Sequence, residues 1–309
     1  MIALRHHFAL LALALAAATA LAGCGLGGSS KNLPSGVHLV ITRDFGHKQL
    51  YSARLPSFPK NETVLGLLQA KHMVATSDTD VRQIAGLAAN NGSDWEYHIN
   101  GLAPDLSAAR QKLSKGDVVQ WDYSPTHTTT TIPAIIGAWP EPFVRGEGGK
   151  RFPVRIECSQ PSSSACKTVT QRLAQAGAVT SSSSLAEAAG SKTLRMVVAP
   201  WSKLKGLGGA VGSLTAGPQQ SGVFARFSKS GNALTLLDIN GVPAKQAPKG
   251  SGLIAATQQK GGGPTWIVTG LSEQGVERAA RALDTRALRN AFAVAVTPKR
   301  TVRLPLRAG

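Results

Sequence analysis

The chain has 309 residues, with 34 Lys and Arg against 17 Asp and Glu, and a formal net charge of +17. Its hydrophobic fraction of 42% suits a core-forming protein and excludes a fully disordered chain. The high positive charge raises the question of nucleic acid, but basic motifs interleaved with aromatic residues are absent from the sequence. We therefore expect a globular protein that has no nucleic acid partner.

Residues 1–23 have the pattern of an export signal: basic residues at 5–7, then a short apolar run that ends at Cys24. The ending Leu21-Ala22-Gly23-Cys24 resembles the lipobox of bacterial lipoproteins. The resemblance implies cleavage before Cys24, lipidation of its thiol, and a cell-membrane location on the extracytoplasmic side. The alternative is an ordinary signal peptide with a chance Cys. No later apolar stretch reaches the 18 residues that a spanning helix needs.

The next segments predict a flexible tether and a small domain. Residues 24–36 are rich in Gly and Ser, which is typical of a flexible coil. In residues 37–124, apolar alternation and turn residues predict strands at 37–42, 49–54, 81–87, 95–99 and 117–123, a helix that starts after Thr63, and a short helical piece at 108–113. One helix crossing a mixed sheet is a β-grasp arrangement.

Two sequence motifs connect this domain to a known family. Residues 92–101 read Gly-Ser-Asp-Trp-Glu-Tyr-His-Ile-Asn-Gly, and residues 113–123 read Leu-Ser-Lys-Gly-Asp-Val-Val-Gln-Trp-Asp-Tyr. They resemble the small domain at the C-terminus of transcobalamin and intrinsic factor, which bacterial surface proteins also carry without an assigned function. The resemblance covers about 37–124 and implies a β-grasp fold, with cobalamin as one conceivable ligand. The helical barrel that holds the other face of cobalamin in transcobalamin is absent from this chain.

Four aromatic residues and one amide form the candidate ligand site. Trp95 and Tyr97 share one face of their strand, as do Trp121 and Tyr123, because residues two apart in a strand point to the same side. They are either an aromatic platform for a planar ligand or core residues that pack on the helix after Thr63. Asn100 begins a tight turn and is the candidate polar contact for the same ligand.

Residues 125–150 form a Thr/Pro-rich connector, and residues 151–309 predict a basic α/β domain. Strands are expected at 153–158, 223–227, 233–239, 253–257, 265–269 and 291–296, and helices at 163–176 and 273–283; residues 194–199 are an apolar run. The fold class is thus α+β, with an N-terminal β-grasp-like domain followed by an α/β domain. Residues 37–124 carry nine basic and nine acidic side chains, whereas residues 125–309 carry 23 basic and 8 acidic ones. That excess either faces anionic lipid headgroups or is simply solvated.

Few residues suggest chemistry. Cys158 and Cys166 are expected to form a local disulfide in an exported protein, with a metal or redox pair as the alternative. The histidines are scattered without metal-ligand spacing, and a Gly-x-Ser-x-Gly elbow is absent from the sequence. We expect no metal site, no cofactor and no enzymatic activity.

These patterns favour a lipid-anchored extracytoplasmic lipoprotein that binds a ligand or assists another envelope protein. Its ligand would be a small planar molecule such as a corrinoid, and its partner a transporter of an uptake system. The alternative is a structural or protein-interaction lipoprotein at the envelope surface with no small-molecule ligand.

Overall fold

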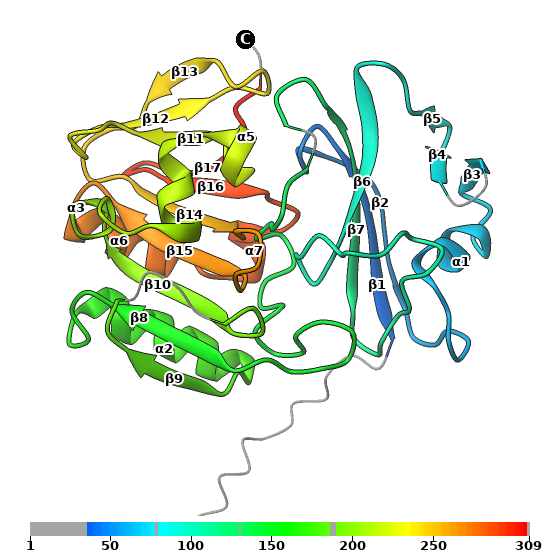
Figure 1. Ribbon diagram of the computed structural model, residues 1–309, viewed down its shortest axis with the longest axis horizontal. Coiled ribbons are helices and arrows are strands. Elements are labelled where there is room, and N and C mark those ends of the chain that lie inside the picture. Colours follow the sequence, from blue (N-terminus) through cyan, green and yellow to red (C-terminus); the bar gives the residue numbers. More distant parts are fainter. Residues whose placement is uncertain (1–35, 78–79, 130, 186–189, 308–309) are drawn as a thin grey trace, which may run out of the picture. The chain divides into compact units, whose positions relative to one another are not determined.

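The computed structural model describes residues 36–307 except 78–79, 130 and 186–189. Cys24, the expected signal segment and most of the expected tether lie outside the described residues. The described residues fall into one compact unit. They comprise a four-stranded sheet with its helix, a connecting segment, and a larger seven-stranded sheet with helices (Figure 1).

The N-terminal half has the expected β-grasp arrangement. Its sheet has the order β2-β1-β7-β6, with β1 parallel to β7 at its centre and antiparallel pairs at both sides. The elements are β1 (Val37–Arg43), β2 (Lys48–Leu55), α1 (Val64–Gln69), β6 (Ser93–Ile99) and β7 (Val118–Pro125). Thr63 caps α1 as expected, because its hydroxyl accepts a hydrogen bond from the Gly66 N–H at 3.0 Å.

Two expectations in this half are wrong. The expected strand 81–87 is split into β4 (Asp80–Ile84) and β5 (Leu87–Ala88), which pair with β3 (Val74–Ser77) in a separate small sheet. Residues 108–110 form a turn in place of a helix. The carbonyls of Ala108 and Gln111 accept hydrogen bonds from Leu65 and Val64 at the start of α1. These carbonyls therefore satisfy the free N–H groups of another helix and do not extend one of their own.

The C-terminal half is built on a mixed seven-stranded sheet with the order β17-β16-β14-β15-β10-β8-β9. Strands β9, β8, β10 and β15 run parallel, and β14, β16 and β17 complete the sheet through antiparallel pairs. The strands are β8 (Val154–Cys158), β9 (Thr180–Ser183), β10 (Leu194–Pro200), β14 (Gly252–Thr257), β15 (Thr265–Gly270), β16 (Ala293–Val296) and β17 (Thr301–Leu304). The sequence did not predict β9 and β17, which have four residues each; β9 has no buried residue and β17 has one.

Two layers cover this sheet. Helices α2 (Ser164–Ala176) and α6 (Glu273–Arg281) pack on one face, where they bury a core around Trp266 (Figure 1). A second core around Trp201 occupies the other face. The elements beyond those already given are α3 (Trp201–Leu204), α4 (Gly209–Gly212), η1 (Ser213–Thr215), α5 (Pro218–Ser221), β11 (Ala225–Phe227), β12 (Leu234–Leu237), β13 (Pro243–Gln246) and α7 (Thr285–Leu288). With the β-grasp half, this establishes the α+β class.

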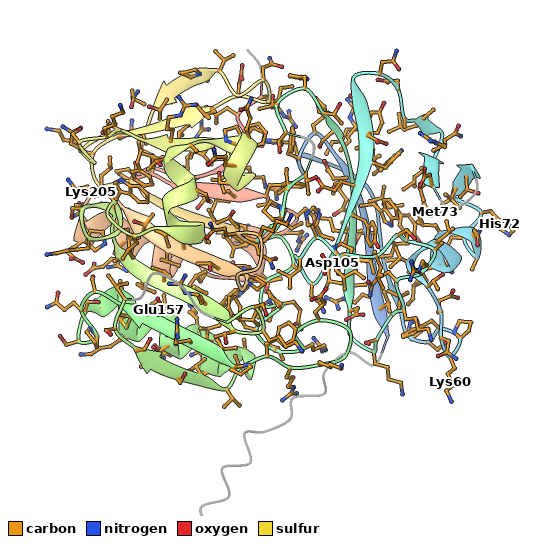
Figure 2. The ribbon with its side chains drawn as sticks, in the orientation of Figure 1. Lys60, His72, Met73, Asp105, Glu157 and Lys205 are labelled. Carbon is orange, nitrogen blue, oxygen red and sulfur yellow. A yellow bond between two sulfur atoms is a disulfide. The ribbon has the colours of Figure 1, made fainter. Side chains whose placement is uncertain are left out.

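The expected disulfide is confirmed. Cys158 ends β8 and Cys166 lies in the first turn of α2, with their Cα atoms 6.1 Å apart and their sulfurs bonded. One residue before Cys158 lies Glu157, which Figure 2 labels at β8. Its carboxylate is fully buried and accepts a hydrogen bond from Arg195 Nη2 at 2.7 Å. Both features fix the same end of β8 against its neighbours in the sheet.

The two halves share hydrophobic core. Phe45, in the turn between β1 and β2, is buried against Phe224 and Phe292 of the C-terminal half, with ring centroids 4.8 and 5.6 Å away. Residues of the expected connector are also buried: Ile135 belongs to the core around Trp201, and Trp139 to the core around Trp266. Segment 125–150 is therefore part of the packed structure and fixes one side of the site described next.

Candidate functional site

The four aromatic residues of the expected platform lie on the face of the small sheet that α1 covers. Strands β6 and β7 place Trp95 opposite Tyr123 and Tyr97 opposite Trp121. The ring centroids of these two pairs are 5.1 and 4.8 Å apart. Trp95 and Trp121 belong to one core with the apolar residues of α1. The structure thus brings all four together, in the arrangement that the packing alternative describes.

The polar atoms of three of these aromatics form hydrogen bonds with backbone carbonyls of neighbouring segments. Trp95 Nε1 donates to the Leu87 carbonyl at 3.0 Å, and the Tyr123 hydroxyl donates to the Ala88 carbonyl at 2.9 Å, both in β5. The Tyr97 hydroxyl donates to the carbonyl of Leu106, and burial raises the pKa of Tyr97. These hydroxyls and this indole N–H hold β5 and the segment of Leu106 against the sheet, so they are already occupied by the protein.

Asn100 holds the turn after β6. It is fully buried and adopts a positive φ of 54°. Its Nδ2 donates to Asp117 Oδ1 and to the Gly146 carbonyl, both at 2.9 Å, and its Oδ1 accepts from the Val118 N–H at 2.9 Å. Its hydrogen-bonding groups are therefore occupied by the protein, and they tie β7 to the connecting segment.

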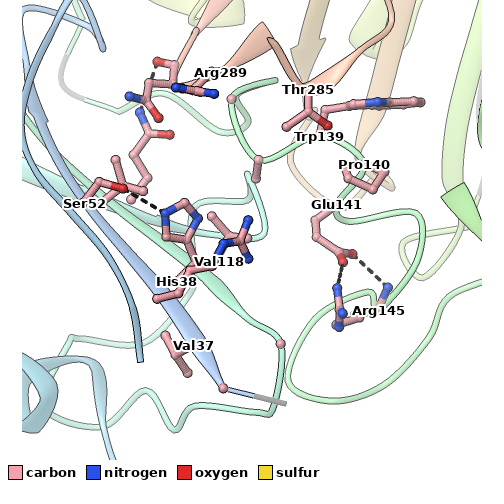
Figure 3. Close-up of a pocket in the computed structure, with 18 of the residues that line it drawn as sticks. Val37, His38, Ser52, Val118, Trp139, Pro140, Glu141, Arg145, Thr285 and Arg289 are labelled. Carbon is pink, nitrogen blue, oxygen red and sulfur yellow. Dashed lines mark hydrogen bonds and ion pairs between the residues drawn. The ribbon is translucent and has the colours of Figure 1, made fainter. Parts of the chain in front are cut away.

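A cavity of about 650 Å³ opens on the opposite face of the small sheet. We call it the arginine pocket, and its ionisable residues are His38, Arg54, Glu141, Arg145 and Arg289 (Figure 3). Strands β1, β2 and β7 form one wall. The other wall comes from the connecting segment and from the residues around α7. None of the residues predicted from the sequence as ligand contacts lines this pocket.

Polar side chains fix how the walls meet. Gln120 of β7 donates from Nε2 to the carbonyl of Asn290 at 3.2 Å, and Asn290 Nδ2 donates to Gln49 Oε1 at 2.9 Å. Gly137 lies at this junction, where a Cβ atom would be 2.8 Å from the backbone of Asn290. Glycine is thus required for the close approach of the two walls. The back of the pocket is rigid because its hydrogen bonds are made within the protein.

The lining residues give the pocket a net positive charge. Burial lowers the pKa of His38, and the nearby charges of Arg54 and Arg289 lower it further. The His38 ring is consequently neutral at pH 7, and its Nε2 forms a 2.9 Å hydrogen bond with Ser52 Oγ. Within the described parts of the chain, neither Arg54 nor Arg289 forms an ion pair. Both arginines line the pocket and are exposed, so their charge is accessible to an anion.

The one carboxylate of the pocket is already paired. Glu141 forms an ion pair with Arg145 and also accepts from the Arg145 N–H at 2.9 Å. Gly116 leaves room for this arginine, since a Cβ atom there would be 2.1 Å from Arg145 Nε. Arg145 Nη2 is buried and has no hydrogen-bond partner among the described residues. A buried donor without a partner is costly. Because this atom is closed to solvent, the accessible cationic groups of the pocket are those of Arg54 and Arg289.

Two further properties of the described residues concern metal binding and membrane crossing. In the described part of the chain, no group of three or more His, Cys, Asp or Glu side chains is placed to hold a metal ion. Across residues 36–307, gaps excepted, no helix is long and apolar enough to cross a membrane. Cys24, the expected lipidation site, lies outside these residues.

Comparison with known proteins identifies one segment. No curated protein and no solved structure matches the chain. Residues 61–125 match the model of a family described as a domain of unknown function (DUF4430). This segment includes α1 and ends with the last residue of β7, so it contains both motifs that resemble the transcobalamin C-terminal domain. The similarity to this family is confined to residues 61–125, within the β-grasp half.

Proposed function

We propose that this protein is a lipid-anchored, extracytoplasmic binding protein whose arginine pocket takes a small anionic molecule. The observation that supports this most is the pocket itself. It brings three arginines and one glutamate together, and the glutamate is already paired with Arg145. Its volume of about 650 Å³ lies within the roughly 300–1,000 Å³ typical of small-molecule sites.

An anion explains the unpaired groups better than a neutral ligand. A carboxylate or phosphate at the mouth would accept hydrogen bonds from Arg54 and Arg289, whose planar groups suit two-oxygen anions. The same anion would favour protonation of His38, because an opposite charge nearby raises the pKa of an imidazole. Binding is then expected to take up a proton and to tighten as the pH falls toward the pKa of His38.

The proposal moves the ligand from the aromatic residues to the other face of the sheet. Trp95, Tyr97, Trp121 and Tyr123 lie on the face that packs against α1, whereas the opposite face of β1 and β7 borders the pocket. The lipid anchor at Cys24 would hold the pocket outside the membrane, where a protein of this kind passes its ligand to a transporter. Corrinoids stay in the set of ligands to be tested because of the transcobalamin resemblance.

Calorimetry tests the proposal directly. Residues 24–309 with Cys24→Ser are titrated with small carboxylates, phosphate esters and corrinoids at pH 6 and pH 7.5. The double variant Arg54→Gln/Arg289→Gln should lose binding by at least about tenfold, since each charged hydrogen bond contributes roughly 1.5–3 kcal/mol. The control is Arg82→Gln/Arg286→Gln, which removes two exposed arginines outside the pocket.

The outcomes separate this proposal from its alternative. Binding that depends on Arg54 and Arg289 but not on the control arginines supports a ligand-binding protein. If neither the anions nor the corrinoids give a heat of binding, the proposal is overturned and the alternative, an envelope interaction protein, is favoured. Its partner would then be sought by crosslinking in cells. Binding that survives the double variant would place the ligand elsewhere on the chain.

A further inference from the structure

A second cavity lies in the C-terminal half, between the edge strand β17 and the hairpin β12–β13. We call it the C-terminal groove, and its volume is about 760 Å³. Its floor is apolar and consists of Leu236, Val302 and Leu306. Leu236 is buried, while Val302 and Leu306 are partly exposed. The backbone N–H of Leu306 donates to the Leu237 carbonyl at 2.7 Å, which joins the strand end to the hairpin and closes one end of the floor.

The rim of this groove is cationic. Lys245, Lys299, Arg300 and Arg307 surround the floor, and all four are exposed. Among the residues that the structure describes, no carboxylate forms an ion pair with any of them. The groove therefore combines an apolar floor with four uncompensated positive charges.

This combination selects the chemistry of the occupant. A small hydrophilic anion would be attracted to the rim but would leave the apolar floor in contact with water. A neutral apolar molecule would cover the floor and leave the cations unused. An amphiphile with an anionic head satisfies both, because burial of its chain and attraction to Lys and Arg are each favourable. A surface-anchored protein has such molecules next to it in the leaflet to which it is attached.

We propose that the C-terminal groove binds an anionic phospholipid of the membrane surface. One acyl chain lies on Val302 and Leu306, and the headgroup phosphate lies between the rim cations. The site is separate from the arginine pocket, with which it shares no lining residue. Its occupation would press the C-terminal half against the bilayer, which gives the basic excess of residues 125–309 a defined point of contact.

The test uses residues 24–309 with Cys24→Ser, so that the lipid anchor does not itself bind vesicles. Cosedimentation is measured with phosphatidylglycerol vesicles and with phosphatidylcholine vesicles at low salt. The rim variant is Lys299→Gln/Arg300→Gln. Lys299 and Arg300 lie in a turn in which the Thr297 hydroxyl donates to the Arg300 carbonyl and accepts from both backbone N–H groups. These bonds do not involve the two replaced side chains, so the turn should persist in the variant. The control is Lys203→Gln/Lys229→Gln, two exposed lysines of the same half that do not line the groove.

The parent protein should prefer phosphatidylglycerol, and the rim variant should bind about 30-fold more weakly, at about fivefold for each cation. The control should bind like the parent. The floor variant Val302→Thr keeps a β-branched residue in β17 and should weaken the binding of a monomeric short-chain phosphatidylglycerol. Glycerol phosphate, which lacks the chain, should not compete.

Several results would overturn the proposal. An equal loss in the rim and control variants would show that general charge, and not the groove, attracts the vesicles. Unchanged binding in the rim variant, or competition by glycerol phosphate as strong as by the short-chain lipid, would remove the site or the role of its floor. Rim-dependent binding of a ten-residue glutamate peptide without binding of vesicles would make an acidic protein segment the occupant.

Discussion

Replacement of Glu96 by Gln should stabilise the protein at neutral and alkaline pH. Glu96 lies on β6 directly opposite Asp122 of β7, and its Oε1 accepts the Ile132 N–H at 2.8 Å. Burial raises the pKa of Glu96 to about 8, and the neighbouring Asp122 contributes in the same direction. A glutamine keeps the acceptor for Ile132 and carries no charge, so it removes the ionisation without removing the hydrogen bond.

The magnitude follows from the difference between the folded and unfolded pKa values. The pKa of Glu96 rises from 4.5 to about 8, so the folded state holds this proton more tightly than the unfolded state between those pH values. Stability is therefore lost as the pH rises through the window. At about 1.36 kcal/mol per pKa unit, the loss is roughly 3 kcal/mol at pH 7 and roughly 5 kcal/mol above pH 8. Glu96→Gln should recover an amount of this order.

The buried His98 makes stability depend on pH in the opposite direction. Burial lowers the pKa of His98 from 6.5 to about 4, although its hydrogen bond with the Ile132 carbonyl acts against that shift. The unfolded state takes up this proton first, so stability is lost as the pH falls from 6.5 to 4, by roughly 3 kcal/mol. Between pH 4.5 and 6.5 the contributions of Glu96 and His98 to the free energy of unfolding therefore change with pH in opposite directions. In Glu96→Gln the loss of stability that His98 causes at acid pH is no longer offset by Glu96.

The pH dependence of the free energy of unfolding is measured by urea unfolding, followed by tryptophan fluorescence, at pH 4.5, 5.5, 6.5, 7.5 and 8.5. The free energy of unfolding of Glu96→Gln should exceed that of the parent by an amount that grows from pH 4.5 upward, to roughly 3 kcal/mol near pH 7 and roughly 5 kcal/mol above pH 8. Asp80→Asn, at an exposed ion pair with Arg82, should follow the parent. A parent curve that is flat from pH 6.5 to 8.5, or a variant less stable at pH 8.5, would refute the reasoning.

The remaining predictions concern the anchor, the disulfide and the aromatic face. Cys24→Ser should abolish labelling of the protein by a clickable fatty acid in cells; equal labelling of the parent and the variant would contradict lipidation. Cys158→Ser/Cys166→Ser should lower the free energy of unfolding by about 2–3 kcal/mol, measured in urea without reductant, because the closed loop is short. Trp95→Ala should cost about 3–5 kcal/mol because it empties part of the core with α1. Cobalamin should give the same calorimetric response with Tyr97→Phe as with the parent; a loss of binding would return the ligand to the aromatic face.

Local patterns predicted much of the fold. The alternation in 37–42 and 95–99 and the cap at Thr63 gave elements that the structure contains, because each depends on residues close in sequence. The disulfide was predictable for the same reason, since its cysteines are eight residues apart. Strands such as β13 were not, because its residues are all exposed and lack apolar alternation. Such a strand forms only because a neighbour, here β12, presents an edge to it.

The candidate site was harder to predict from the sequence than the fold. The sequence drew attention to the aromatic residues, but it could not tell a platform from a core without knowing which face α1 covers. The arginine pocket joins His38 to Arg289, which lie 251 positions apart in the chain. No spacing or motif connects such residues, and their proximity depends on how the turn of Phe45 and the connecting segment pack. The excess of basic over acidic residues in 125–309 was a signal in the sequence, but it did not say which residues would meet.

The central claim is that the arginine pocket binds a small anion, and the pKa of His38 tests it most directly. The pKa is measured by NMR titration of the histidine ring, assigned with His38→Gln, in the parent and in Arg54→Gln/Arg289→Gln. In the free parent it should lie below 6.5, and it should rise in the double variant, which lacks the two repelling charges. A bound anion should raise the parent value by about one unit or more and leave the double variant unchanged. A His38 pKa that is the same in the parent with and without every carboxylate and phosphate ester of the set would contradict the account.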